Sequence, residues 1–273
     1  MTLPPSRDWA ALCWPDLDRA AAAGWIAVLP LAATEQHGPH LPLGTDTLIA
    51  DAFLARVRTL LPADSPAVFL PVQQVGVSTE HTDYPGTLTL PPAAALAAWT
   101  ALGEAVARAG LRKLVMVTSH GGNSAAMMLV AQELRARHRM LAVTTSWARL
   151  SSSEAAFAPE EVRDGIHGGA VETSIMLAAW PQHVRRAAAA DFPSATRAHD
   201  FRRLSIGRPA PYAWQAQDLH PQGVVGDAGR ASAEAGQRLI DHGARAFCDL
   251  LDDIARFDLA ALGSGPAQPF NPA

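Results

Sequence analysis

Residues 25–46 read WIAVLPLAATEQHGPHLPLGTD and change abruptly from apolar to polar. The apolar part, residues 25–31, is typical of a buried β-strand. The polar part is rich in Gly, Pro and His, and apolar residues then recur at helical spacing from Thr47 to about Leu61. We expect Asp46 to cap this helix, because a side-chain oxygen at that position can accept a backbone N–H. The stretch therefore predicts a strand, a polar loop and a helix in succession.

The same alternation continues along the chain. Further strands are predicted at 68–72, 114–118 and 140–145, and helices at 92–108, from 124 to about 137, at 168–180 and at 232–256. Alternation of this kind indicates an α/β fold, with a mostly parallel sheet covered by helices on both faces. Two long intervals, 151–164 and 191–227, look irregular, which is typical of lids, partner-binding segments or mobile loops.

Length and composition favour one domain. The chain has 273 residues, of which 49% are apolar, and this is enough to bury a sizeable core. We expect a single domain over residues 1–262 and a flexible Gly/Pro-rich tail over 263–273. Only Cys13 and Cys248 are present, so a disulfide framework or a thiolate zinc site is not expected.

The charge pattern excludes two classes of partner. Lys and Arg total 22 and Asp and Glu 26, giving a net charge of −4 without long runs of either sign. This balance does not favour nucleic acid or an anionic membrane. No apolar run approaches the roughly 20 residues of a membrane-spanning helix. Met1 to Asp8 carries two prolines and two charges where a signal peptide would be apolar, so we expect a cytoplasmic protein.

Residue types that bind metals gather at the ends of predicted elements. Glu35 and His37 are two residues apart, so an extended backbone would direct both side chains to the same side. Asp46 follows nine residues later, where a loop can bring its carboxylate back over the strand end. A carboxylate has two oxygens and can bridge two ions, which imidazole does not readily do.

Two more segments contain histidine beside glycine, like the segment from Glu35 to Asp46. Ser119-His-Gly-Gly-Asn123 lies between a predicted strand and a helix, at the sheet edge where α/β proteins place their ligands. The adjacent glycines, including Gly121, let a backbone approach a ligand closely. His167 precedes a predicted helix and Glu172 lies about one turn into it. These residues can converge with Glu35, His37 and Asp46, and three such segments together predict a metal site.

Four motifs in this order resemble those of the creatininase (creatinine amidohydrolase) family. They are EQHGPHLPLGTD (35–46), GVSTEH (76–81) with YPGTLTL (84–90), SHGGN (119–123) and HGGAVETS (167–174). The resemblance implies a three-layer α/β/α domain, hydrolysis of amide-type C–N bonds and a homo-oligomer, commonly a hexamer. It also implies two divalent metal ions per subunit, either zinc or zinc with manganese.

The resemblance assigns roles to individual residues. Glu35 and His120 match the ligands of one metal, His37 matches a ligand of the other, and Asp46 matches the bridging carboxylate. Creatininase has a glutamate where this chain has Gly122, so Glu172 is expected to complete the second site instead.

The resemblance also implies the residues that act on substrate. His167 matches the catalytic histidine, which would carry a proton to the departing nitrogen. In creatininase an acidic residue precedes that histidine, whereas this chain has Ile166 there. Ser78 and Gly121, in two of the matching motifs, are expected to bind substrate. Trp147 has two interpretations, a flat wall for a planar substrate or core packing.

Several functions remain open on the sequence. The leading hypothesis is a metal-dependent hydrolase of a small molecule such as a cyclic amide or a formamide. The changes at Gly122 and Ile166 favour a substrate other than creatinine, with creatinine amidohydrolase proper as the alternative. A non-catalytic metal-binding scaffold is a third reading. Glu80 and His81 have two interpretations: a second layer that orients metal ligands, which is favoured, or direct binding of metal.

Overall fold

A parallel four-stranded sheet forms the centre of the molecule. The computed structural model describes residues 2–21, 23–207 and 209–263. The strands are β1 (Ile26–Leu31), β2 (Ala67–Phe69), β3 (Lys113–Thr118) and β4 (Leu141–Ser146), in the order β2-β1-β3-β4. Every neighbouring pair is parallel, as the alternation of strands and helices predicts.

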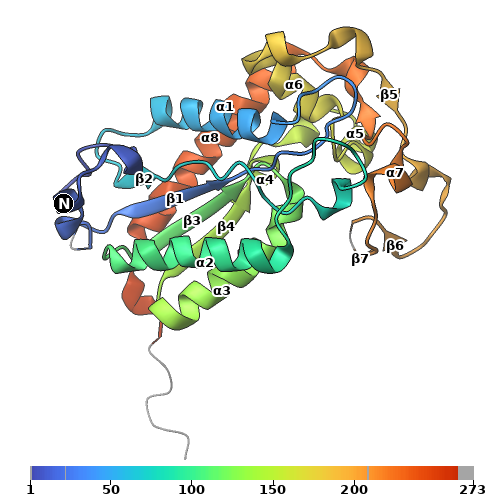
Figure 1. Cartoon of the computed structure of the whole chain (residues 1–273). Helices are drawn as coiled ribbons and strands as arrows, with labels where there is room; N and C mark the ends of the chain where they lie inside the picture. Colours follow the sequence, from blue (N-terminus) through green and yellow to red (C-terminus); the bar gives the residue numbers. More distant parts are fainter. Residues whose placement is uncertain (1, 22, 208, 264–273) are drawn as a thin grey trace, which may run out of the picture.

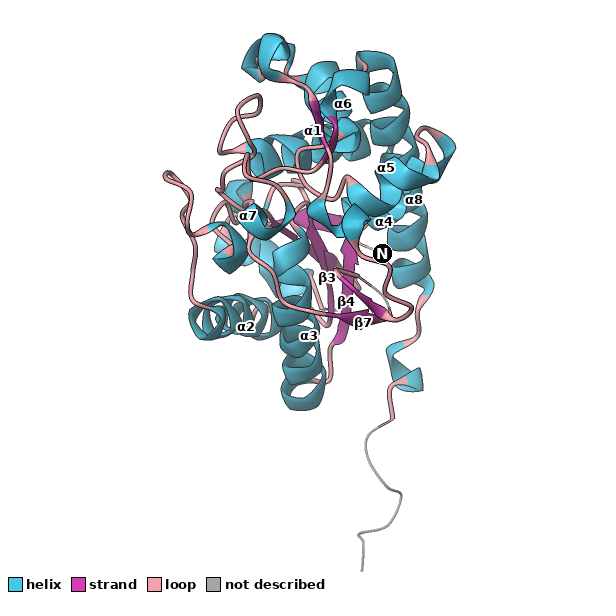
Figure 2. Ribbon diagram, turned by 90° about the vertical axis from the view of Figure 1, so that its right-hand side faces the viewer, coloured by secondary structure: helices cyan, strands magenta, loops and turns pink. Residues whose placement is uncertain are grey.

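Helices cover both faces of this sheet (Figure 1). One layer contains α2 (Pro92–Arg108) and α3 (Ser124–His138). The other contains α1 (Thr45–Leu60), α6 (Ala170–Ala179) and α8 (Ala233–Arg256). Figure 2 shows the strands between these layers from a second direction. The predicted three-layer α/β/α fold is confirmed.

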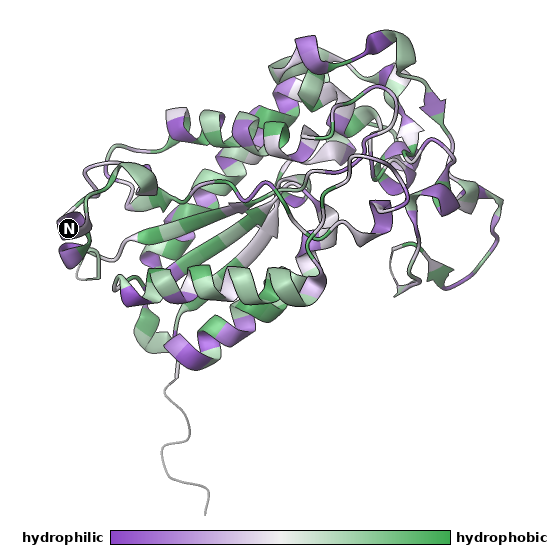
Figure 3. Ribbon diagram, viewed as in Figure 1, coloured by the Kyte–Doolittle hydropathy of each residue, from purple (hydrophilic) through white to green (hydrophobic). Residues whose placement is uncertain are grey.

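The side chains of β1 explain why both faces are covered. Ile26 and Val28 pack with α1, α6 and α8, whereas Ala27 and Leu29 pack with α2 and α3. Successive side chains of a strand point to opposite faces, so a strand that is apolar throughout needs a helical layer on each side. In Figure 3 most of β1 and of the neighbouring β3 has the green colour of apolar residues.

Shorter elements extend the fold beyond the sheet. They are α4 (Trp147–Leu150), α5 (Pro159–Asp164), α7 (Ala216–Leu219), β5 (Asp191–Phe192), β6 (Leu204–Ser205), β7 (Ala210–Pro211) and β8 (Gly226–Asp227). Short 3₁₀ helices span Trp9–Ala11, Trp14–Arg19, Thr79–His81, Gly121–Asn123, Ser153–Ala155, Pro181–His183, Arg186–Ala188, Ala195–Ala198, Ala228–Arg230 and Leu259–Ala261.

Two local predictions need correction. Asp46 does not cap α1, because the helix begins at Thr45 with Gly44 as its N-cap and Asp46 lies buried inside the first turn. The interval 151–164 is not wholly irregular, because Pro159 opens the helix α5 there. Proline suits the first position of a helix, where its missing N–H leaves no hydrogen bond unmade.

Two further observations bear on the ends of the chain and on membranes. Of the predicted tail, residues 264–273 lie outside the described residues, and the division at residue 262 stays a prediction. Among the helices that the structure describes, none combines the length and the apolarity needed to cross a bilayer.

The pairing of β1 with β3 positions the polar loops. Leu31 pairs with Thr118, so the two strands end side by side. The connection continues past the strands: Ser119 N donates to the Leu31 carbonyl at 3.1 Å, and Asn123 Nδ2 donates to the Ala32 carbonyl at 3.0 Å. The segments that begin at residues 32 and 119 are therefore fixed next to each other at the carboxyl edge of the sheet.

We expect Gly236→Ala to destabilise the protein. Gly236 lies on α8 against α6, and a Cβ there would overlap the carbonyl of Ser174. Helix propensity alone would favour alanine by about 1 kcal/mol. Because a backbone carbonyl cannot rotate away, overpacking should instead lower the free energy of unfolding by about 1–3 kcal/mol in urea titrations. Gly207→Ala is the control, because a Cβ there meets no atom of the described residues within 4 Å. A stabilised Gly236→Ala protein would contradict this packing.

Candidate metal centre

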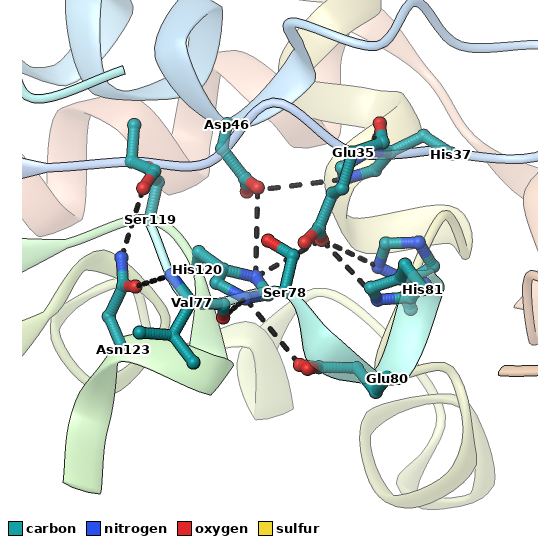
Figure 4. Close-up of polar contacts among 12 residues, drawn as sticks. Glu35, His37, Asp46, Val77, Ser78, Glu80, His81, Ser119, His120 and Asn123 are labelled. Carbon is teal, nitrogen blue, oxygen red and sulfur yellow. Dashed lines mark hydrogen bonds and ion pairs between the residues drawn. The ribbon is translucent and has the colours of Figure 1, made fainter. Parts of the chain in front are cut away.

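The five residues predicted to hold metal come together in one cluster at the carboxyl edge of the sheet. His120 Nδ1 lies 3.1 Å from Glu35 Oε1 and 3.7 Å from Asp46 Oδ2. His37 Nε2 lies 3.8 Å from Glu172 Oε2 and 4.0 Å from Asp46 Oδ1. Figure 4 shows that Glu35, Asp46 and His120 point toward one another from different elements. Residues up to 137 positions apart in the chain thus share one site.

The ligand atoms form two groups that share Asp46. One group is Glu35, Asp46 and His120, and the other is His37, Asp46 and Glu172. Within each group the ligand atoms lie within 4.8 Å of one another, and all these side chains except Glu172 are buried. A third group, Glu35, His37 and His167, satisfies the same distance. The two groups that share Asp46 offer positions for two ions on either side of one carboxylate.

Several of these atoms are buried without a hydrogen-bond partner. In the described chain they include Glu35 Oε2, His37 Nε2 and Asp46 Oδ2. A buried polar atom left unpaired costs about 1–3 kcal/mol, and a charged group costs more. Carboxylate oxygens and imidazole nitrogens are also the donors that zinc and manganese accept. The site therefore fits divalent cations, which would satisfy these atoms together.

Backbone carbonyls fix the orientation of the three central histidines. The nitrogens that face a carbonyl are His120 Nε2 (Val77, 2.8 Å), His37 Nδ1 (Glu35, 3.1 Å) and His167 Nε2 (Gln36, 2.8 Å). A carbonyl only accepts, so each of these nitrogens donates and carries the hydrogen. When such a ring is neutral, its other nitrogen is free to face the cluster as a ligand or a base.

The chain is similar to known proteins over most of its length. The family described as Creatininase: Creatinine amidohydrolase matches residues 10–251. The chain belongs to the creatininase family. It is 32% identical over 218 residues to the mycofactocin precursor peptide peptidase of Mycolicibacterium smegmatis, covering 79% of each chain. It is 28% identical to the creatinine amidohydrolase of Pseudomonas putida, covering 84% of this chain and 90% of the relative.

The solved structures agree with the assignment to the creatininase family. A structure titled "Creatininase Mn" has a TM-score of 0.74 and 26% sequence identity, with coverage of 91% of this chain and 98% of that chain. The chain is therefore a creatininase-family hydrolase, with groups of residues that are capable of holding metal.

Burial and neighbouring charges shift the pKa values within the cluster. Burial, followed by the charge of Glu35, raises the pKa of Asp46 well above its usual range. Burial also opposes charge on Glu35 and His120, but their mutual attraction outweighs it. The pKa of Glu35 is lowered, mainly by His120, and that of His120 is raised to about 10, mainly by Glu35. The metal-free cluster therefore holds a proton on His120, which a cation binding there has to displace.

A second layer of polar residues lies around the ligand cluster. His81 Nε2 lies 3.5 Å from Glu35 Oε1, and Glu80 Oε1 lies 3.5 Å from His120 Nε2. Burial, followed by the charge of His167, lowers the pKa of His81 to about 3. Both residues therefore lie next to predicted ligands, and their role in orienting those ligands stays a prediction.

Gln36 is the residue of this layer that the sequence analysis missed. Its Nε2 lies 2.8 Å from His81 Nδ1 and donates to the Gly223 carbonyl. Its Nε2 also lies 3.3 Å from Nε2 of His167. Gln36 therefore contacts the surrounding histidines and loops, and nothing in its residue type marked it beforehand.

The predicted substrate-binding residues have different surroundings. Ser78 is fully buried beside the cluster, and its hydroxyl has no hydrogen-bond partner in the described chain (Figure 4). Gly121 is exposed, and a side chain there would meet no atom within 4 Å. Substrate binding by Ser78 and Gly121 stays a prediction.

Trp147 requires a correction. Its side chain is 1% exposed and stacks on Phe53 with ring centroids 4.7 Å apart, and Phe247 lies against it at 4.9 Å. A ring covered by two aromatic neighbours has no free face for a substrate. The structure therefore assigns Trp147 to the core, which is the second of the two interpretations that the sequence left open.

We expect Asp46→Asn to lose bound metal. The substitution keeps the size of the side chain but removes the negative charge that the two groups share. The purified wild-type protein should contain two equivalents of divalent metal by mass spectrometry, and the variant should contain less than one. Asp51→Asn, on an exposed position of the same helix, should keep both equivalents. Two tightly bound equivalents in Asp46→Asn would exclude the sharing of this carboxylate.

Proposed function

We propose that this chain is a metal-dependent hydrolase that cleaves an amide-type C–N bond with two divalent cations. The observation that carries the proposal is the pair of ligand groups that meet at Asp46. Glu35, Asp46 and His120 would hold one cation, and His37, Asp46 and Glu172 the other. Zinc, or zinc with manganese, suits this mixture of imidazole and carboxylate donors.

The residues of the chain divide the work around these cations. The chemistry supplied at such a site is that of a Lewis acid, which lowers the pKa of a water molecule and stabilises charge on a carbonyl oxygen. The five ligands fix where that chemistry takes place, and the burial of Glu35, His37, Asp46 and His120 keeps bulk water away from it.

His167 is proposed to move the proton. Its Nε2 donates to the Gln36 carbonyl, which leaves Nδ1 without hydrogen and 3.6 Å from Glu35 Oε1. During hydrolysis an O–C bond forms from water and the C–N bond breaks. His167 Nδ1 would accept the proton of the water and deliver it to the leaving nitrogen. Its small exposed area, 7%, suits a group that works inside a closed site.

The position of Gly122 supports a substrate other than creatinine. A Cβ there would lie 2.5 Å from the Val77 carbonyl and 2.6 Å from Glu80 Oε1, so no side chain can enter the site from this position. Glu172 supplies the carboxylate instead, from a different side. The greater identity to a peptidase, 32% against 28% for a creatinine amidohydrolase, favours peptide or related small amides.

The assembly state and the cellular location are also proposals. We infer a homo-oligomer, a hexamer by family resemblance, that acts on a small molecule. The composition and charge of the sequence support a cytoplasmic location and no nucleic-acid or membrane partner.

We expect His167→Gln to lose turnover and keep metal. Metal-loaded protein should hydrolyse at least one member of a panel of lactams, formamides, ureido compounds and short peptides, and chelation should abolish the activity. The substitution should lower kcat by about 10²–10⁴, the range that general acid–base catalysis contributes. Both metal equivalents should remain, since the two groups that share Asp46 do not include His167.

The control is His183→Gln, which changes an exposed histidine. Unchanged turnover in His167→Gln would assign the proton transfer to another residue. Loss of one metal equivalent together with activity would make His167 a ligand through its group with Glu35 and His37. A fully active protein without metal would refute the proposal as a whole.

A further inference from the structure

A buried glutamate, Glu161, lies outside the cluster and has no part in the mechanism above. It belongs to α5 and is 8% exposed. Its Oε1 accepts the backbone N–H of Ala170 at 2.7 Å, and its Oε2 accepts the backbone N–H of Asp227 at 2.8 Å. One carboxylate thus ties α5 to the start of α6 and to β8, three elements that are separate in the chain.

Three glycines make room for this carboxylate. A Cβ at Gly165 would overlap Glu161 Oε1, and a Cβ at Gly169 or Gly226 would lie 2.6 Å from the same atom. The three backbones therefore enclose the carboxylate so closely that none of them can carry a side chain without a shift. The space between these three glycines therefore fits the planar carboxylate of Glu161 in the position that it occupies.

The enclosed segments also hold the catalytic and metal-binding residues. Gly168 N, in the turn that precedes α6, donates to Glu172 Oε2 at 2.7 Å. Val225 N, next to β8, donates to the His167 carbonyl at 2.9 Å. Hydrogen bonds therefore connect the segment at the start of α6 both to Glu161 and to Glu172. The segment around β8 is hydrogen-bonded in the same way to Glu161 and to the backbone of His167.

We propose that Glu161 is a positioning residue that sets the place of Glu172 and, through it, the affinity of one of the two cation positions. The inference rests on the proposed binuclear function. Its target is the position formed by His37, Asp46 and Glu172, because only that group takes a ligand from α6. The position formed by Glu35, Asp46 and His120 depends on other elements.

The charge of Glu161 is needed as well as its shape. Both oxygens accept a backbone N–H, so a glutamine would turn its NH₂ group toward one of these donors. Ala170 is the first residue of α6, whose own N-cap Gly169 has no side chain to accept a hydrogen bond. The carboxylate takes over that role, and a negative charge is favourable at a helix N-terminus. Glu161→Gln should therefore release the start of α6 while leaving the volume unchanged.

The test is calorimetric titration of zinc into chelator-treated protein, with far-UV circular dichroism as the check on folding. Wild type should bind two equivalents. Glu161→Gln should bind one equivalent as wild type does and the other at least tenfold more weakly. Glu160→Gln, which changes the exposed neighbour, should behave as wild type. In a Glu172→Gln background, Glu161→Gln should weaken zinc binding no further, because both changes act on the same position.

Gly165→Ala provides an independent route to the same result. Its Cβ would meet both the carboxylate and the backbone carbonyl of Glu161 and so displace the carboxylate, which should weaken the same equivalent. This variant decides the question if Glu161→Gln does not fold. Wild-type binding of both equivalents by these variants, or equal weakening of the two, overturns the positioning role. Failure of wild type to bind two equivalents overturns the binuclear function instead, and the inference with it.

Discussion

The burial of two carboxylates beside each other is the constraint that organises this site. Glu35 and Asp46 lie in the interior with oxygens that no N–H or O–H of the described chain satisfies. Two like charges that share a buried space destabilise a fold, which raises the pKa of Asp46 and favours a proton or a positive charge beside the pair. In the metal-free protein a proton on His120 supplies part of that charge, as its raised pKa indicates. Divalent cations would supply more, which couples the stability of this region to the ligand that it binds.

Parallel pairing of two strands explains how distant residues reach that site. Because β1 and β3 end at the same level, the loops after Leu31 and Thr118 deliver Glu35 and His120 to one edge without long excursions of the chain. Backbone carbonyls then orient the imidazoles, so much of the rigidity of the centre comes from main-chain groups. Such positions are less sensitive to sequence than side-chain networks, and the surrounding loops are free to vary in substrate preference.

Much of the fold and the list of clustered residues was predictable, because both rest on local signals. Apolar runs of strand length and helical spacing located the main elements, and short-range spacing placed Glu35 and His37 on one side. The errors arose where contacts across the fold decide the outcome. Asp46 has the residue type of an N-cap, but it lies buried in the first turn of α1, where its carboxylate faces the other residues of the cluster. Trp147 looked equally suited to a substrate or to the core, and only the positions of Phe53 and Phe247 decide between them.

Glycines around the site leave space that neighbouring carboxylates occupy, and this space is visible only in the folded structure. At Gly122 the absence of a side chain leaves room for Glu80 beside His120, and it removes the entry point for a ligand from that segment. The carboxylate that completes the second group therefore comes from α6, through Glu172. In the proposed binuclear site, this origin would make the second cation position dependent on the turn at 165–169 and on the strand at 226–227, which Glu161 joins. Changes in loops far from the sheet edge can then alter one cation position while the position next to β1 and β3 stays as it is.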